Sequence, residues 1–182
     1  MTGSGTDAPT APDERPRGRA RVITVSTSAA AGQAEDRSGP VLVEGLRTLG
    51  WDTPAPVVVA DGPAVAGALR GCLAETVDVV LLTGGTGLTA DDTTPEQVTP
   101  LLDRLVPGIA ESLRADGLAR GVVTSSLSRG VAGVAGTTLV VTLPGSTGAC
   151  RDALQVLGPL LPHAVAMLVG AAAAHGHGRG ET

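Results

Sequence analysis

The stretch Val77-Asp-Val-Val-Leu-Leu-Thr-Gly-Gly-Thr-Gly87 decides the fold. Its first seven residues are apolar except for Asp78 and Thr83, which is typical of a strand buried in a parallel sheet. Three of the next four residues are glycines, which let the backbone turn sharply and approach a ligand closely. A buried strand that ends in such a loop predicts an α/β protein with a ligand site beyond the C-terminal ends of its strands.

Strands and helices alternate on both sides of this stretch. Apolar runs predict further strands at residues 21–26, 56–60 and 138–143. Apolar residues at helical spacing predict helices at residues 39–49, 63–74, 95–113 and 147–157. This alternation predicts a mostly parallel sheet with helices covering both of its faces.

Two of these helices carry start signals. Pro63 is expected at the first helical position, where its missing N–H group has no helical partner to lose. Thr94 as the N-cap, Pro95 as the first helical residue and Gln97 at the third position form a predicted capping box.

The two ends of the chain lack the pattern of a core. Residues 1–19 predict a disordered leader and residues 171–182 a flexible tail, which leaves residues 20–170 as one ligand-binding domain. The apolar stretch 153–174 contains Pro159 and Pro162. Because these prolines would break a spanning helix, we expect two buried helical pieces and no membrane span.

The composition excludes several classes of protein. The net charge of −5 argues against a nucleic-acid partner, which would favour a basic stripe. All 13 basic residues are arginines, so a Walker A lysine and a lysine Schiff base are excluded. Cys72 and Cys150 show no metal or redox spacing, and no signal peptide precedes the domain, which predicts a cytoplasmic protein.

The predicted strand ends carry side chains suited to phosphate and metal. They are Ser26 after the first strand, Asp61 after the second, the loop Thr83, Gly84, Gly85, Thr86 and Gly87, the residues Ser128 and Arg129, and the loop Pro144, Gly145 and Ser146. Asp92 follows the glycine loop by five residues. A carboxylate beside a phosphate site repels the ligand unless a cation lies between them, so Asp92 is a candidate Mg²⁺ ligand. Capping of the helix that begins at Pro63 is an alternative role for Asp61, and a favourable interaction with a helix dipole is an alternative role for Asp92.

The combination of these motifs is specific. The glycine loop is followed by Asp92 and by Thr94-Pro95-Glu96, and the chain also contains Pro107-Gly108, Leu127-Ser128-Arg129 and Leu143-Pro144-Gly145-Ser146. Over residues 21–170 the sequence resembles the MoaB/MogA family of molybdenum cofactor biosynthesis, the molybdopterin adenylyltransferases.

The resemblance implies a three-layer α/β/α fold with one reversed strand, a homotrimer, and transfer of AMP from Mg²⁺-ATP to molybdopterin with release of pyrophosphate. It assigns Asp61 and Asp92 as the functional aspartates, and Gly84 to Gly87 as the nucleotide phosphate loop. Ser128, Arg129 and the loop from Pro144 to Ser146 would line the ligand pocket.

The chain departs from the family pattern at one strand end. Where the family commonly continues Ser-Asp-Arg, this sequence reads Ser26-Thr27-Ser28, so two hydroxyls replace a charged pair. An alternative is therefore a family member that binds molybdopterin or a nucleotide without turnover, or that serves as a partner protein. A CinA-like nucleotide-processing relative shares the glycine string, but such proteins normally carry it within a longer chain.

Overall fold

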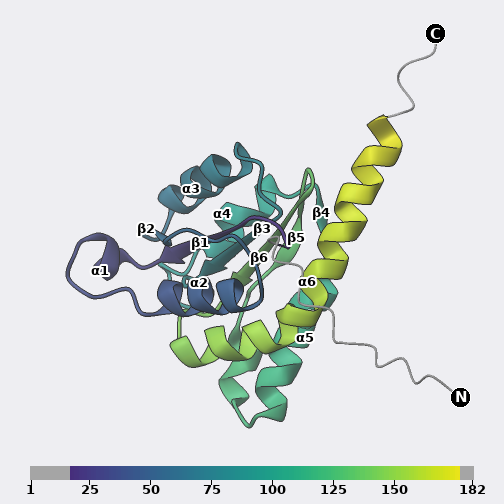
Figure 1. Cartoon of the computed structure of the whole chain (residues 1–182). Helices are drawn as coiled ribbons and strands as arrows, with labels where there is room; N and C mark the ends of the chain where they lie inside the picture. Colours follow the sequence, from purple (N-terminus) through teal and green to yellow (C-terminus); the bar gives the residue numbers. More distant parts are fainter. Residues whose placement is uncertain (1–16, 177–182) are drawn as a thin grey trace, which may run out of the picture.

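Residues 17–176 are described by the computed structural model, and six strands within this range form one sheet in the order β2-β1-β3-β6-β5-β4 (Figure 1). The strands are β1 Ala20–Val25, β2 Val57–Val59, β3 Val79–Thr83, β4 Arg104–Leu105, β5 Ala132–Ala135 and β6 Thr138–Leu143. β1, β2, β3 and β6 are parallel, whereas β5 is antiparallel to both of its neighbours. Among the described strands β5 is therefore the reversed one, as predicted.

Helices cover both faces of this sheet. They are α1 Thr27–Ala30, α2 Ser38–Thr48, α3 Pro63–Leu73, α4 Thr94–Val98, α5 Pro107–Ala119 and α6 Thr147–Gly176, with 3-10 turns η1 Thr99–Leu101 and η2 Val123–Leu127. Residues of α2, α5 and α6 join the core on one face, and residues of α3 and α4 join the core on the other. The predicted three-layer α/β/α architecture is confirmed.

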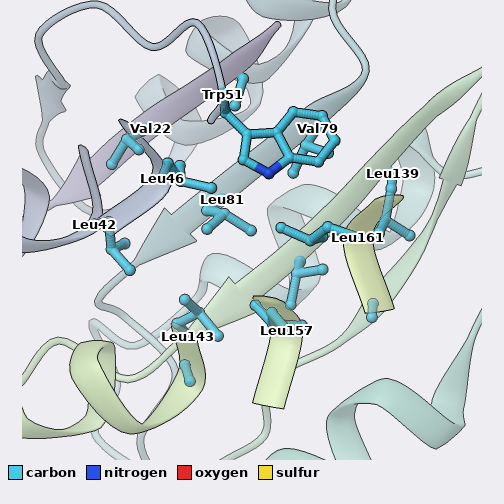
Figure 2. Packing of buried hydrophobic residues seen from close by; sticks show 14 of the residues in the cluster. Val22, Leu42, Leu46, Trp51, Val79, Leu81, Leu139, Leu143, Leu157 and Leu161 are labelled. Atoms are coloured by element: carbon cyan, nitrogen blue, oxygen red, sulfur yellow. The ribbon is translucent and has the colours of Figure 1, made fainter. Parts of the chain in front are cut away.

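Alternation along the strands divides the core into two parts. On β1 and β3, Val22 and Leu81 belong to the cluster that includes α2 and α6, while Ile23 and Leu82 belong to the cluster that includes α3. This period of two is the pattern of strands buried on both faces. Figure 2 shows the first cluster, in which Trp51 lies among aliphatic side chains.

The predicted helix at residues 95–113 is wrong in its middle. α4 ends at Val98, the chain passes through η1 and β4, and α5 begins only at Pro107. Pro100 and Pro107 cannot donate helical hydrogen bonds, and the Asp103 N–H donates instead to the Val134 carbonyl beside β4. Pairing with β5 therefore replaces helix in this segment, and the sequence pattern showed neither β4 nor β5.

The predicted capping box is also wrong. The N-cap of α4 is Thr93, which makes no side-chain capping bond, and Thr94 lies inside the first turn with its side chain fully buried. The Thr94 backbone N–H donates to the Gly85 carbonyl at 3.0 Å, which ties the start of α4 to the glycine loop.

The prediction of two helical pieces after residue 153 is wrong, because α6 runs unbroken through Pro159 and Pro162. Its buried residues recur at helical spacing and pack against the sheet; they are Cys150, Ala153, Leu157, Leu161 and Val165. α6 is long and apolar enough to cross a membrane by length and composition alone, but this stripe faces the protein core.

The two predicted ends of the chain lie partly within the described residues. Residues 1–16 of the predicted leader and 177–182 of the predicted tail lie outside the described residues. Residues 171–176 are helical, as the last part of α6. Arg17 donates its N–H to the Gly50 carbonyl, and Arg19 forms a bridge with Asp52, so residues 17–19 pair with the body of the protein.

Candidate functional site

An open cleft of ≈ 1300 Å³ lies at the C-terminal ends of β1, β2, β3 and β6. The segments that follow these strands meet there, because parallel strands end at the same edge of the sheet. The predicted site residues that line the cleft are Ser26, Asp61, Gly84, Gly85, Thr86, Gly87, Asp92, Ser128, Pro144, Gly145 and Ser146. Strands distant in sequence thus bring one set of side chains together.

The glycine loop after β3 depends on glycine at two positions. Gly84 has φ +107, and a Cβ there would lie 2.1 Å from the Val25 carbonyl oxygen. Gly85 has φ +63, and a Cβ there would lie 2.3 Å from Thr94 Oγ1 and 2.8 Å from Asp61 Oδ1. Left-handed backbone and this close packing both exclude a side chain. The loop is therefore pressed between the end of β1, the start of α4 and Asp61.

Asp92 closes a turn at the edge of the cleft. Its Oδ2 accepts hydrogen bonds from Thr89 N at 2.9 Å and from Thr89 Oγ1 at 2.5 Å. The Thr89 hydroxyl is the main cause that holds the pKa of Asp92 below its ordinary value, and Arg129 contributes a smaller attraction. Asp92 is therefore ionised at neutral pH.

Asp61 faces the glycine loop from the end of β2. The N-cap of α3 is Gly62, which makes no side-chain capping bond, so Asp61 does not cap that helix. Its Oδ2 accepts instead from Thr27 Oγ1 at 2.9 Å and from Thr27 N at 3.3 Å. The capping alternative for Asp61 is thus wrong.

The tip after β1 folds into the short helix α1, which the sequence analysis did not predict. Ser26 is its N-cap and accepts from Ala29 N at 3.3 Å. A serine followed by Thr27 and Ser28 is a recognisable start signal, but four residues are too few for helical periodicity to appear.

Arg129 does not line the cleft, contrary to expectation. Its Nε donates to the Gly87 carbonyl at 2.7 Å, and its two Nη atoms donate to the Asp92 carbonyl and to Glu96. The hydrogen bond that Glu96 accepts from Arg129 is the main cause that lowers the pKa of Glu96. All three guanidinium nitrogens bond to the glycine loop, to Asp92 and to α4. Arg129 therefore holds these segments together outside the lining of the cleft.

Thr83, which was also predicted as a site residue, does not line the cleft. Its side chain is fully buried, and its hydroxyl donates to the Pro144 carbonyl at 2.9 Å. The Gly84 N–H, just after β3, donates to the carbonyl of Leu143 at the end of β6, at 3.0 Å. These two bonds fix the glycine loop against the loop that follows β6.

The cleft is acidic. Carboxylates line it at Glu35, Asp36, Asp61, Asp91 and Asp92, and among the described residues Arg37 is the one basic residue in the lining. The segment 33–38 of this lining was absent from the predicted site, because no strand end marks it. Asp36 has a structural role there: its Oδ1 accepts from the N–H groups of Ser38 and Gly39 at the start of α2.

This charge pattern fits a bound divalent cation if the ligand is a phosphate. A polyphosphate in a cleft of carboxylates is repelled unless a cation lies between the charges. Within the described residues, no three His, Cys, Asp or Glu side chains are grouped as a complete metal site. Single carboxylates beside a phosphate site suit Mg²⁺, which takes one or two carboxylates and completes its shell with phosphate oxygens and water.

Comparison with known proteins places the chain in a family. Residues 21–163 match the family MoCF_biosynth, described as "Probable molybdopterin binding domain". A molybdenum cofactor biosynthesis bifunctional protein of Synechococcus elongatus is 43% identical over 167 residues, covering 88% of this chain and 52% of that protein. The chain therefore spans about half the length of that relative.

Two further proteins match over most of both chains. The molybdopterin adenylyltransferase of Pyrococcus furiosus is 36% identical over 140 residues, which cover 75% of this chain and 82% of that protein. A solved structure of MogA superposes with a TM-score of 0.80 at 46% identity and covers 82% of this chain and 99% of that one.

Proposed function

The chain belongs to the MoaB/MogA family of molybdenum cofactor biosynthesis proteins, and on that basis we propose that it is a molybdopterin adenylyltransferase. In the proposed reaction, an oxygen of the terminal phosphate of molybdopterin bonds to the α-phosphorus of ATP. The bond from that phosphorus to the bridging β-phosphate oxygen breaks, and pyrophosphate leaves. The products are adenylylated molybdopterin and pyrophosphate.

The observation that carries this proposal is the position of the glycine loop between two aspartates at the strand ends. Gly85 packs against Asp61 Oδ1, and Gly87 packs against the carboxylate of Asp92. A backbone without side chains lets phosphate oxygens approach its N–H groups. The cleft is also large enough for two ligands, since single drug-sized ligands occupy pockets of about 300–1,000 Å³.

The cleft offers alignment rather than a protein nucleophile. Its described lining contains no Lys, Cys or His. None is required, because the attacking phosphate oxygen is already anionic at neutral pH. Backbone N–H groups and the hydroxyls of Ser26, Ser128 and Ser146 would hold the two substrates so that attack and departure are in line.

Asp92 is the residue proposed to hold the metal. Both Thr89 donors act on its Oδ2, so Oδ1 is the oxygen that we assign to the metal. Mg²⁺ bound there would neutralise the negative charge of the polyphosphate and of the leaving pyrophosphate. Arg129 fixes the backbone carbonyl of Asp92 and so keeps that carboxylate at the cleft.

The test is release of pyrophosphate from ATP by the purified protein. We expect release only when Mg²⁺ and molybdopterin are both present. Asp92→Asn should reduce turnover at least a hundredfold, in the range seen when one electrostatic contact to a transition state is removed.

Asp103→Asn is the matched control. Asp103 accepts the Gly136 N–H at the opposite end of the sheet, and asparagine can still accept that bond. This variant should keep wild-type turnover. If both ligands bind to the wild-type protein and no pyrophosphate appears, the chain is a binding protein of this family and not an enzyme.

A further inference from the structure

Thr27 and Asp61 are joined by a reciprocal set of hydrogen bonds. Thr27 Oγ1 donates to Asp61 Oδ2 at 2.9 Å, and the Thr27 N–H approaches the same oxygen at 3.3 Å. In return, the Asp61 N–H donates to Thr27 Oγ1 at 3.2 Å. Three bonds therefore connect the start of α1 with the segment that follows β2.

These bonds make the two oxygens of Asp61 unequal. Both Thr27 donors act on Oδ2, whereas Oδ1 lies 2.8 Å from the position a Cβ on Gly85 would take. Rotation of the carboxylate would break the contacts to Thr27. Asp61 therefore presents one fixed oxygen to the glycine loop.

The chemistry of residue 27 makes this arrangement possible. A threonine hydroxyl can donate to Asp61 and accept from its N–H group at the same time. An ionised carboxylate at position 27 could not donate such a bond and would repel Asp61. The Thr27 hydroxyl thus supplies the donor that holds Asp61 Oδ2.

We propose that Thr27 is a positioning residue that orients Asp61 toward the nucleotide loop. This inference rests on the proposed adenylyl transfer, because it assigns a role within that site. Thr27 acts through Asp61, so its loss should slow the chemical step more than it weakens substrate binding.

The test uses Thr27→Val, which keeps the shape and removes the hydroxyl, and Thr27→Ser, which keeps the hydroxyl. Hydrogen bonds to a charged group have effects that correspond to roughly tenfold to a hundredfold in rate. We expect Thr27→Val to lower kcat by that factor with KM for ATP changed less than about threefold, and Thr27→Ser to restore most of kcat.

Two comparisons separate positioning from general damage. Thr48→Val is the matched control, because the exposed Thr48 hydroxyl donates to the Glu44 carbonyl of its own helix; it should leave kcat unchanged. In an Asp61→Asn background, Thr27→Val should cause little further loss, since residues that act as one unit are not additive.

A readout independent of turnover is hydrogen exchange at the Asp61 amide. It should become faster in Thr27→Val and stay near wild type in Thr27→Ser. Wild-type activity that survives Thr27→Val unchanged, or exchange at Asp61 that does not respond, overturns the role of Thr27 alone. An inactive wild-type protein overturns the proposed function and, with it, this inference.

Discussion

Gly85 is the residue at which backbone conformation and site geometry coincide. An alanine there would need a left-handed backbone, at a cost of about 1–2 kcal/mol, and its Cβ would collide with Thr94 and Asp61. We therefore expect Gly85→Ala to lower the free energy of unfolding by at least ~1 kcal/mol and to weaken nucleotide binding. Urea unfolding and calorimetric titration with Mg²⁺-ATP measure the two effects.

Gly67→Ala provides the comparison for that substitution. Gly67 is an exposed residue of α3 with no atom near the place of a Cβ, so alanine should stabilise the helix by about 0.5–1 kcal/mol. A Gly85→Ala protein as stable as wild type would show that the loop does not need its left-handed conformation.

Asp92 gives a prediction about pH. Its pKa in the folded protein lies below the ordinary value of 3.8, so its ionised form stabilises the fold. This contribution is complete at neutral pH and is lost as the pH falls below 3.8 through the folded-state pKa. The difference in unfolding free energy between wild type and Asp92→Asn should therefore be largest at neutral pH and shrink in acid. A difference that does not vary with pH would contradict the Thr89 contact.

Strand ends alone predicted most of the residues that meet in the cleft. The C-terminal ends of parallel strands must share one edge, so Asp61 and the glycine loop could be brought together without coordinates. The orientation of the Arg129 side chain could not be predicted. It bonds to Glu96 and to two backbone carbonyls, whose positions are set only when the loop is folded. Thr27 appeared only as a departure, since its partner lies 34 residues away.

Among the elements, α6 shows packing overriding local preference. Pro159 and Pro162 each remove a helical donor, yet the helix continues because its stripe from Cys150 to Val165 is buried on the sheet. The sequence pattern contains both signals and does not say which one dominates. The same competition ended differently at Pro100, where a strand partner was available.

Pro159 is exposed, so its effect on α6 can be measured without disturbing the core. Pro159→Ala should restore a helical hydrogen bond and raise the free energy of unfolding by about 1–3 kcal/mol. Pro63→Ala, at the favourable first position of α3, should give no such gain. Thermal unfolding followed by circular dichroism compares the two; equal effects would show that the interior position of Pro159 carries no cost.

At the scale of the whole molecule, the outer half of α6 runs beyond the sheet (Figure 1). It exposes apolar side chains at Met167 and Val169. The family resemblance predicts a homotrimer, and contacts between copies would cover apolar surface of this kind. Sedimentation equilibrium should give three times the mass of the chain. A stable monomer at micromolar concentration would contradict the prediction.

The fold class was predictable because hydrophobic alternation and the glycine loop both pointed to a parallel sheet. The acidity of the cleft could not be predicted, because Glu35 and Asp36 reach the cleft from a loop that does not directly follow a strand. An acidic cleft repels a polyphosphate unless a cation lies between the charges, so the proposed binding of ATP should depend on a cation. We expect affinity for ATP to fall sharply when Mg²⁺ is removed by a chelator, and calorimetric titration with and without Mg²⁺ measures this change.

The most direct measurement is pyrophosphate release in single-turnover conditions with ATP, Mg²⁺ and purified molybdopterin. Adenylyl transfer predicts one pyrophosphate for each molybdopterin consumed, no release without molybdopterin, and a loss of at least a hundredfold in Asp92→Asn but not in Asp103→Asn. Release of pyrophosphate at the same rate without molybdopterin, or no release while both ligands remain bound, would contradict the account.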